Sequence, residues 1–246
     1  MIKTDWVGSA GGPELHVAMP EGPARGAVVV VQEIFGVTAH VREVCADLAG
    51  EGYVAVAPDL YWRRARRAEH GRDDGLRLMR DLRREEVLAD VLAARTEAVS
   101  RAGRGGAAIV GLSLGGHVAI LAAAAVPFDV VVDFYGGWVV HGGIPLADPA
   151  PPVEGSAAIA ALGAFVLGFV GEHDHLVPPA EWQEFGRRLT AAGVAHELVS
   201  YPEAGHGFLC ADRPDTYDAT ASASARARLL TALHDRLDRL DRTVET

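Results

Sequence analysis

Ser113 lies in the pentapeptide Gly111-Leu112-Ser113-Leu114-Gly115, which stands between two apolar stretches of the chain. Residues 107–111 predict a short buried strand, and residues 114–125, rich in alanine and glycine, predict a helix packed closely on a sheet. A serine at such a junction must adopt a tight, strained turn, which the flanking glycines permit. Its hydroxyl then stands at the positive end of a helix, where an attacking oxygen gains electrostatic support. The junction therefore predicts a nucleophilic serine above the edge of a sheet.

Apolar runs of strand length alternate with helical periodicity along the whole chain. After Thr38, a possible helix cap, apolar residues recur at the i, i+3, i+4, i+7 spacing of a helix. This alternation predicts an α/β fold in which a mainly parallel central sheet carries helices on both faces, as one domain over residues 1–246. The other expected strands are 26–31, 53–57, 129–134, 164–170 and 196–200, and the other expected helices are 76–99, 179–192 and 215–240.

Composition excludes several classes of function. The formal net charge is −10, and no basic face dominates, which argues against a nucleic-acid partner. The chain lacks an uninterrupted apolar run of about 18 residues, which a membrane span needs. It also lacks a basic segment followed by an apolar stretch at the N-terminus, so no signal peptide is expected. With two cysteines, Cys45 and Cys210, and no disulfide pattern, a cytoplasmic location is the prediction.

Two loops carry the residues that a serine nucleophile needs. Acyl transfer requires a base that takes the hydroxyl proton and an acid that orients the base. In an open α/β sheet these groups come from loops after the strands. Asp174 follows the expected strand 164–170, and His206 follows the expected strand 196–200. The order Ser113, Asp174, His206 is that of α/β-hydrolases.

Other interpretations of these loops are weighed as well. Asp133 ends the preceding strand and is a rival for the acid, as is Glu172. His173, His175 and His206 could be read as a metal cluster, but their i, i+2 spacing on a loop is a weak ligand pattern. The prediction is therefore a site without metal or cofactor.

The loop Gln32–Gly36 follows the expected strand 26–31 and is placed to form an oxyanion hole. The backbone N–H groups of Ile34 and Leu114 are the expected donors. Glu33 is the odd member, because a carboxylate beside an oxyanion is unfavourable unless it has a partner or a proton. Glu33 is either a salt-bridged loop residue or a residue that contacts Ser113 or His206, and we predict the second.

Five segments together resemble the dienelactone hydrolase family, also called carboxymethylenebutenolidases. They are residues 31–37, 58–61, 111–116, 171–178 and 203–208, and the likeness extends from about residue 10 to about residue 235. The resemblance implies the α/β-hydrolase fold. It also implies that Glu33 interacts with the nucleophile and that two arginines hold a substrate carboxylate. Arg72 matches the first arginine. The second position is Cys210, and whether Arg213 replaces the missing arginine is left open.

The chain differs from the family in its nucleophile, which is usually cysteine and here is Ser113. We predict a serine hydrolase that cleaves an ester or lactone bond of a small molecule through an acyl-enzyme, working as a monomer or homodimer. Tyr61 and Trp138 are expected to contact substrate, and the segment 138–161 to cover the pocket. Two alternatives stay open: a biosynthetic cyclase or isomerase that reuses the same site, and a non-catalytic binding protein on this fold.

Overall fold

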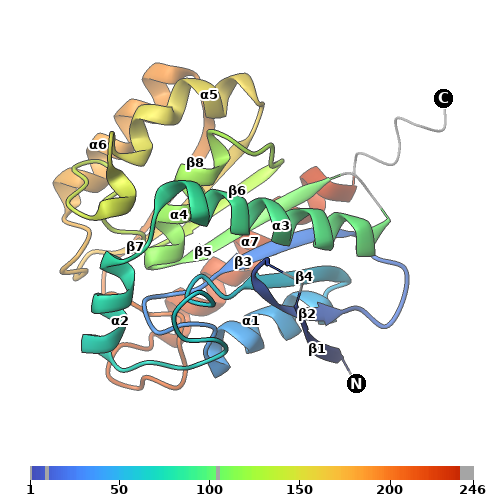
Figure 1. Ribbon diagram of the computed structural model, residues 1–246. Helices are drawn as coiled ribbons and strands as arrows, with labels where there is room; N and C mark the ends of the chain where they lie inside the picture. The colour runs from blue at the N-terminus through green and yellow to red at the C-terminus, as the bar shows by residue number, and fades with distance from the viewer. Residues whose placement is uncertain (1, 9–10, 104–105, 239–246) are drawn as a thin grey trace.

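The computed structural model describes residues 2–8, 11–103 and 106–238, and within them the chain forms one eight-stranded sheet (Figure 1). The strand order is β1-β2-β4-β3-β5-β6-β7-β8. From β4 to β8 the neighbours pair in parallel, whereas β1 and β2 are antiparallel additions at one edge. The strands are β1 Lys3–Gly8, β2 Glu14–Met19, β3 Gly26–Val31, β4 Tyr53–Pro58, β5 Ala107–Leu112, β6 Val130–Phe134, β7 Phe165–Gly171 and β8 Ala195–Tyr201.

The central strands are buried on both faces, because helices cover the sheet from each side. Within β3, Val29 and Val31 point into one apolar core, and Val28 and Val30 point into the other. Strands of this kind are continuous β-branched runs without polar alternation, which is why β3 could be recognised from its sequence. The prediction of a mainly parallel sheet with helices on both faces is confirmed.

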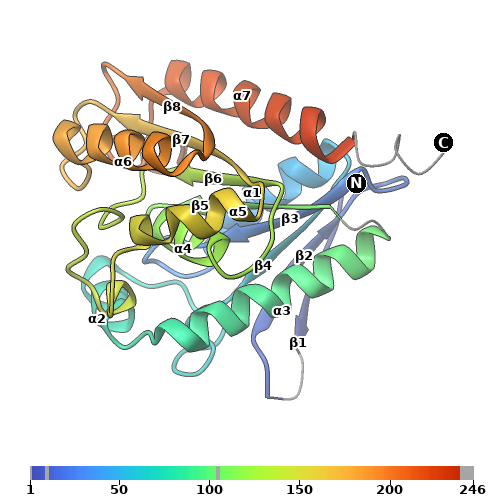
Figure 2. The same cartoon turned by 90° about the horizontal axis from the view of Figure 1, so that it is seen from above.

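Helices cover both faces of the sheet (Figure 2). Residues of α1 (Ala39–Gly50) and α7 (Ala219–Leu237) pack into the same core, while α3 (Arg84–Ala102), α4 (Leu114–Ala123) and α6 (Pro179–Ala192) pack into the opposite core. Thr38 caps α1 as predicted: its hydroxyl accepts the Val41 N–H. Among the described helices, none has the length and apolar character needed to cross a membrane.

The prediction of one continuous helix over 76–99 is wrong. The structure has two helices in this region, α2 (Arg72–Arg80) and α3. Leu82 is buried at the break. The positions three and four residues after it are Glu85 and Glu86, so the apolar stripe cannot continue along one helix. Leu92, assigned to that stripe, is 48% exposed. The break lets α2 and α3 take different directions.

Near the two ends of the chain, the structure differs from the expectations in the closing helix and in two edge strands. The closing helix begins at Ala219 rather than at residue 215, and its predicted end at Leu240 lies outside the described residues. The edge strands β1 and β2 were not predicted, since the buried Glu14 and His16 interrupt the apolar pattern of β2.

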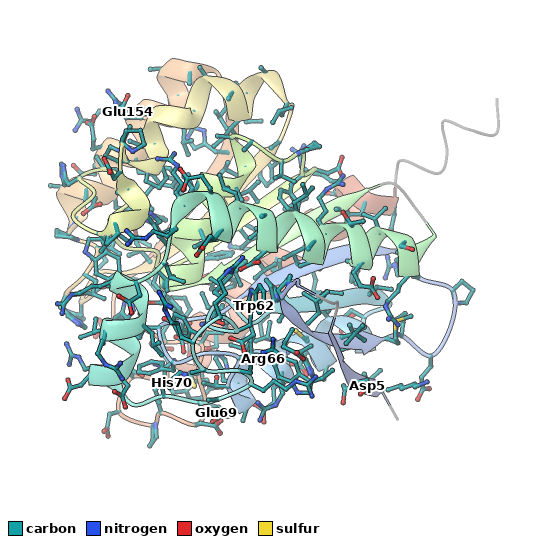
Figure 3. The ribbon with its side chains drawn as sticks, in the orientation of Figure 1. Asp5, Trp62, Arg66, Glu69, His70 and Glu154 are labelled. Atoms are coloured by element: carbon teal, nitrogen blue, oxygen red, sulfur yellow. The ribbon has the colours of Figure 1, made fainter. Side chains whose placement is uncertain are left out.

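The segment 138–161, which was expected to cover the pocket, packs several of its side chains into the core of the fold. It forms two short 3-10 turns, Pro145–Ala147 and Pro152–Gly155, and then α5 (Ser156–Ala161). Leu146, Val153 and Ile159 are buried in the core shared with α3, α4 and α6. Glu154, labelled in Figure 3, pairs with Arg188 of α6. This segment therefore extends a helical layer of the fold.

Candidate active site

Ser113 occupies the sharp turn between β5 and α4. Its φ of 53° is positive, a conformation that residues with a side chain rarely adopt. The neighbouring glycines make the turn possible: a Cβ on Gly111 would stand 1.9 Å from the Gly115 carbonyl oxygen, and a Cβ on Gly115 would stand 2.2 Å from the Val31 oxygen. The Ser113 N–H donates to the Phe134 oxygen of β6 at 2.9 Å, which fixes the turn to the sheet.

Ser113, His206 and Asp174 form a continuous hydrogen-bonded chain. Ser113 Oγ is 2.9 Å from His206 Nε2, and His206 Nδ1 is 2.9 Å from Asp174 Oδ2. The other carboxylate oxygen, Asp174 Oδ1, accepts the N–H groups of Leu176 at 2.7 Å and Val177 at 3.1 Å. The acid is therefore held from both sides, and its side chain is fully buried while that of His206 remains partly accessible.

Asp133, the rival acid, makes no hydrogen bond to His206 in the described structure. Its Oδ1 accepts the Gly136 N–H at 2.7 Å, and its Oδ2 is buried without a hydrogen-bond partner. A Cβ on Gly116 would stand 2.1 Å from Oδ1, so the carboxyl lies against the first turn of α4. Burial raises the pKa of Asp133 to about 7, and the hydrogen bond from Gly136 opposes that shift. The geometry thus favours Asp174 as the partner of the histidine.

The loop Glu33–Gly36 is fixed from behind through its carbonyl groups. The hydroxyl of Tyr61 donates to the Ile34 oxygen at 3.1 Å, and the His70 N–H donates to the Phe35 oxygen at 3.0 Å. A Cβ on Gly75 of α2 would stand 2.4 Å from the same Ile34 oxygen, so helix and loop are in direct backbone contact. Figure 3 labels His70 on the segment that leads from β4 to α2. These contacts fix the orientation of the loop.

Tyr61, expected to contact substrate, has a different place. Its side chain is only 1% exposed and its hydroxyl is committed to the backbone of the loop. It supports the loop from below. The N–H groups of Ile34 and Leu114 donate to no described residue, so both remain available to an external acceptor.

Glu33 does not hydrogen-bond to Ser113 or His206 within the described structure, and that part of the prediction is corrected. Both of its oxygens accept from Arg213 Nη2, at 2.6 and 2.7 Å. Burial opposes the charge of the guanidinium, but the Glu33 carboxylate outweighs it, so the pKa of Arg213 is raised. The guanidinium lies 5.2 Å from the centre of the Phe35 ring, close to the His206 loop. The salt-bridged interpretation of Glu33 is the one that the structure shows.

Arg72 and Trp138 make no hydrogen bond to Ser113, His206 or Asp174 in the described structure. Arg72 is the first residue of α2 and is exposed; within the described residues it makes no hydrogen bond or ion pair. It lies three positions before Gly75, on the helix face that meets the Ile34 loop. Trp138 is half-buried with a positive φ of 61° in the turn after β6.

Two aromatic rings, those of Tyr135 and His175, flank the imidazole of His206. The Tyr135 ring lies edge-on to His206 with centroids 5.1 Å apart, and the His175 ring lies edge-on at 5.6 Å. Tyr135 is fully buried, has a φ of 47°, and its hydroxyl has no partner. The signal for Tyr135 was its place at the end of β6, where a strand terminus faces the same edge as Ser113. In the part of the chain described, no group of three or more histidine, cysteine or acidic side chains is placed to hold a metal ion.

Comparisons with known proteins show which family the chain resembles. Residues 14–237 match the sequence model of the Dienelactone hydrolase family. Carboxymethylenebutenolidase from a Pseudomonas species is 34% identical over 216 residues, which cover 83% of this chain and 84% of that protein. A protein of Synechocystis, provisionally named a carboxymethylenebutenolidase, is 33% identical over 205 residues, covering 80% and 81%. A crystal structure from Klebsiella pneumoniae, provisionally a dienelactone hydrolase, superposes with a TM-score of 0.83 at 32% identity and covers 95% and 98% of the two chains.

Proposed function

The chain belongs to the dienelactone hydrolase family, and from that premise we propose that it cleaves its substrate through an acyl-enzyme formed on Ser113. Membership makes the protein a hydrolase that acts on ester or lactone bonds. The single observation that carries the mechanism is the line of two 2.9 Å contacts from Ser113 Oγ through His206 to Asp174. The histidine reaches the hydroxyl with one ring nitrogen and the carboxylate with the other, as a general base requires.

The proposed reaction proceeds in two steps. His206 Nε2 takes the Ser113 proton as Oγ bonds to the acyl carbon, and the carbonyl becomes an oxyanion. When the oxyanion collapses, the carbon–oxygen bond to the leaving group breaks and His206 returns the proton to the leaving oxygen. Water then attacks the acyl-enzyme by the same route. Asp174 keeps the histidine in the required tautomer and stabilises its charged form.

The N–H groups of Ile34 and Leu114 are the proposed donors to the oxyanion. Leu114 is the first residue of α4, so its N–H has no partner inside the helix and lies at the positive end of the helix dipole. The fixed carbonyls of the Ile34 loop leave its N–H unbound. Donors that are already oriented need no rearrangement during the reaction, which is the main source of their effect.

Arg72 supports a substrate that carries a carboxylate, because it is an exposed cation on α2, three positions before Gly75, which meets the Ile34 loop. Arg213 lies at the His206 loop in the region where Cys210 occupies the expected arginine position, but its charge is already paired with that of Glu33. Relatives named carboxymethylenebutenolidase suggest carboxymethylenebutenolide as a first substrate for assay. Its methyl ester is the matched neutral control. Arg72→Ala should lower kcat/KM for the acid about tenfold and for the methyl ester less than twofold, since one charge-assisted contact is worth roughly 1.5–3 kcal/mol.

Active-site labelling tests the serine mechanism directly. A fluorophosphonate should label the wild type and leave Ser113→Ala unlabelled, and the variant should lose several orders of magnitude in hydrolysis of 4-nitrophenyl acetate. Asp174→Asn should lower kcat by about 10⁴, the loss known for the equivalent change in a serine protease triad, whereas Asp133→Asn should stay within threefold. Equal labelling of the wild type and Ser113→Ala would remove Ser113 as the nucleophile. A binding protein on this fold would neither label nor hydrolyse.

A further inference from the structure

The imidazole of His206 lies between two rings of opposite character. Tyr135 covers it from the protein interior and is fully buried, whereas His175 covers it from the solvent side and is exposed. Burial raises the pKa of the Tyr135 hydroxyl well above its usual range, so that ring stays neutral under all working conditions. Histidine is the side chain that changes charge between pH 5 and 8. His175, on the solvent side, is therefore the ring beside the proposed base that can carry a positive charge.

The backbone holds His175 at this place. Leu176 and Val177, which follow it, both donate their N–H groups to Asp174 Oδ1, and Asp174 precedes it. A turn closed by an aspartate side chain in this way restricts the intervening residue. His175 therefore cannot drift freely, although its side chain is exposed.

The surroundings of His206 isolate the effect of His175. Within the described residues, the charged or titratable groups that contact His206 or lie near it come from five segments of the fold. The acid on Nδ1 and the hydroxyl on Nε2 belong to the reaction, and the nearby Glu33–Arg213 pair sums to no net charge. The full set of groups around His206 is Asp174 and His175 after β7, Tyr135 after β6, Ser113 after β5, Arg213 after β8 and its partner Glu33 after β3.

We propose that His175 is a positioning residue that tunes the proton affinity of His206, an inference that rests on the proposed role of His206 as general base. As a neutral ring, His175 packs against the imidazole edge-on. When His175 is protonated, its charge opposes the imidazolium that His206 must become during attack by Ser113. The same charge also resists protonation of His206 in the resting enzyme.

This mechanism has a signature that a structural role lacks. A fixed positive charge at position 175 lowers kcat/KM at high pH, because it destabilises the transition state in which His206 is charged. The same charge makes His206 harder to protonate, so the fall of kcat/KM on the acid side of the pH profile (the acid limb) moves to lower pH. The two effects have the same origin and comparable size, so the profiles of charged and neutral variants converge at low pH. Loss of packing would lower the rate at every pH without moving the limb.

The experiment compares His175→Gln with His175→Arg, and uses His173→Gln and His173→Arg as matched controls. His173 lies two residues away on the same loop, is exposed, and has no ring contact with His206 in the described structure. The readout is kcat/KM for 4-nitrophenyl acetate from pH 5 to 9, measured at the isosbestic wavelength of 4-nitrophenol. At pH 8.5, His175→Arg should be about 3- to 10-fold slower than His175→Gln, as expected for a unit charge at this separation near solvent. Its acid limb should lie about 0.5–1 pH unit lower, and both His173 variants should match the wild type within twofold.

An NMR titration of the His206 imidazole in the same variants gives a readout that does not depend on hydrolysis. The midpoint of His206 should be about 0.5–1 pH unit lower in His175→Arg than in His175→Gln, by the same Coulomb estimate. Unchanged midpoints for His206 would overturn the proposal, as would a fall in rate without a shift of the limb. If the protein hydrolysed no ester, the proposed function would fail, and the NMR titration would still decide whether His175 acts on His206.

Discussion

One nitrogen of Arg213 donates to both carboxylate oxygens of Glu33, at 2.6 and 2.7 Å, and joins two residues that are 180 positions apart in the chain. The carboxylate is almost completely buried, whereas about a third of the arginine side chain is exposed. The two partners therefore depend on each other unequally. Glu33 has no access to water that could replace the guanidinium, but Arg213 does.

Removal of Arg213 should cost more stability than removal of the charge on Glu33. Arg213→Met leaves a buried carboxylate without a cation, and such losses run to about 3–5 kcal/mol; we expect about 2–3 here because the pair is partly open to solvent. Glu33→Gln should cost less, and the double variant should recover part of the loss. Urea unfolding measures these differences. Arg226→Met, which breaks a pair with the half-exposed Asp47, is the control and should cost under about 1 kcal/mol. A loss for Arg213→Met no greater than the control would contradict the prediction.

Asp133 should make the protein less stable as the pH rises. Its pKa is 3.8 in the unfolded reference and about 7 when buried. Between these values the folded state binds the extra proton, so the stabilisation is complete below pH 4 and is lost as the pH passes 7. Three pH units correspond to an upper limit of about 4 kcal/mol. The unfolding free energy of the wild type minus that of Asp133→Asn should fall by about 2–4 kcal/mol from pH 4 to pH 8. A difference that stays constant over this range would show that the carboxyl is not kept neutral by burial.

Two buried tyrosines should respond oppositely to loss of the hydroxyl. In Tyr61 the hydroxyl donates to the Ile34 oxygen, so Tyr61→Phe should cost about 0.5–1.5 kcal/mol and lower kcat through a looser oxyanion loop. In Tyr135 the hydroxyl has no partner, so Tyr135→Phe should leave the melting temperature equal or higher. Thermal unfolding and kcat on 4-nitrophenyl acetate are the measurements. A destabilised Tyr135→Phe would mean that its hydroxyl has a partner in solution.

Replacing Gly75 should lower kcat although it should not destabilise the helix α2 that contains this residue. Alanine is favoured over glycine inside a helix by about 1 kcal/mol, yet a Cβ at Gly75 would meet the Ile34 oxygen at 2.4 Å. Gly75→Ala should therefore displace the Ile34 loop and lower kcat about 10- to 100-fold, somewhat less than complete loss of an oxyanion donor. Gly71→Ala, at the N-cap of the same helix with open space around it, is the control and should change kcat less than twofold. Similar kcat values for the two variants would show that the contact between α2 and the Ile34 loop does not affect catalysis.

The elements that could be predicted are those whose sequence carries a clear local signal, such as an uninterrupted apolar run or residues typical of helix ends. Strand β3 is an unbroken run of small and β-branched residues. Helix α6 has a proline at its start and Gly193 just past its end, so its predicted bounds of 179–192 match the structure. The strand β2 could not be predicted, because Glu14 is buried only through its pairing with the arginines of a later loop. A partner that is distant in sequence leaves no local signal.

The same distinction applies to the site. Ser113, Asp174 and His206 each follow a recognisable strand, so topology alone predicted that they would meet. The partner of Glu33 could not be chosen from the sequence, because Arg213 lies on a loop with no strand to place it. His175 was considered only as a metal ligand, since the direction of a side chain on a loop depends on the turn that Asp174 closes.

At the turn that carries Ser113, the backbone conformation does not depend on which nucleophilic side chain is present. Gly111 and Gly115 face backbone oxygens, so neighbouring main chain sets the conformation at position 113, and the side chain there contributes only the atom that it presents to His206. A thiol could occupy that place without any change in the surrounding backbone. Evolution can therefore exchange oxygen for sulfur at the reacting position in a single step, and the reactivity of this scaffold can diverge while its folding stays the same.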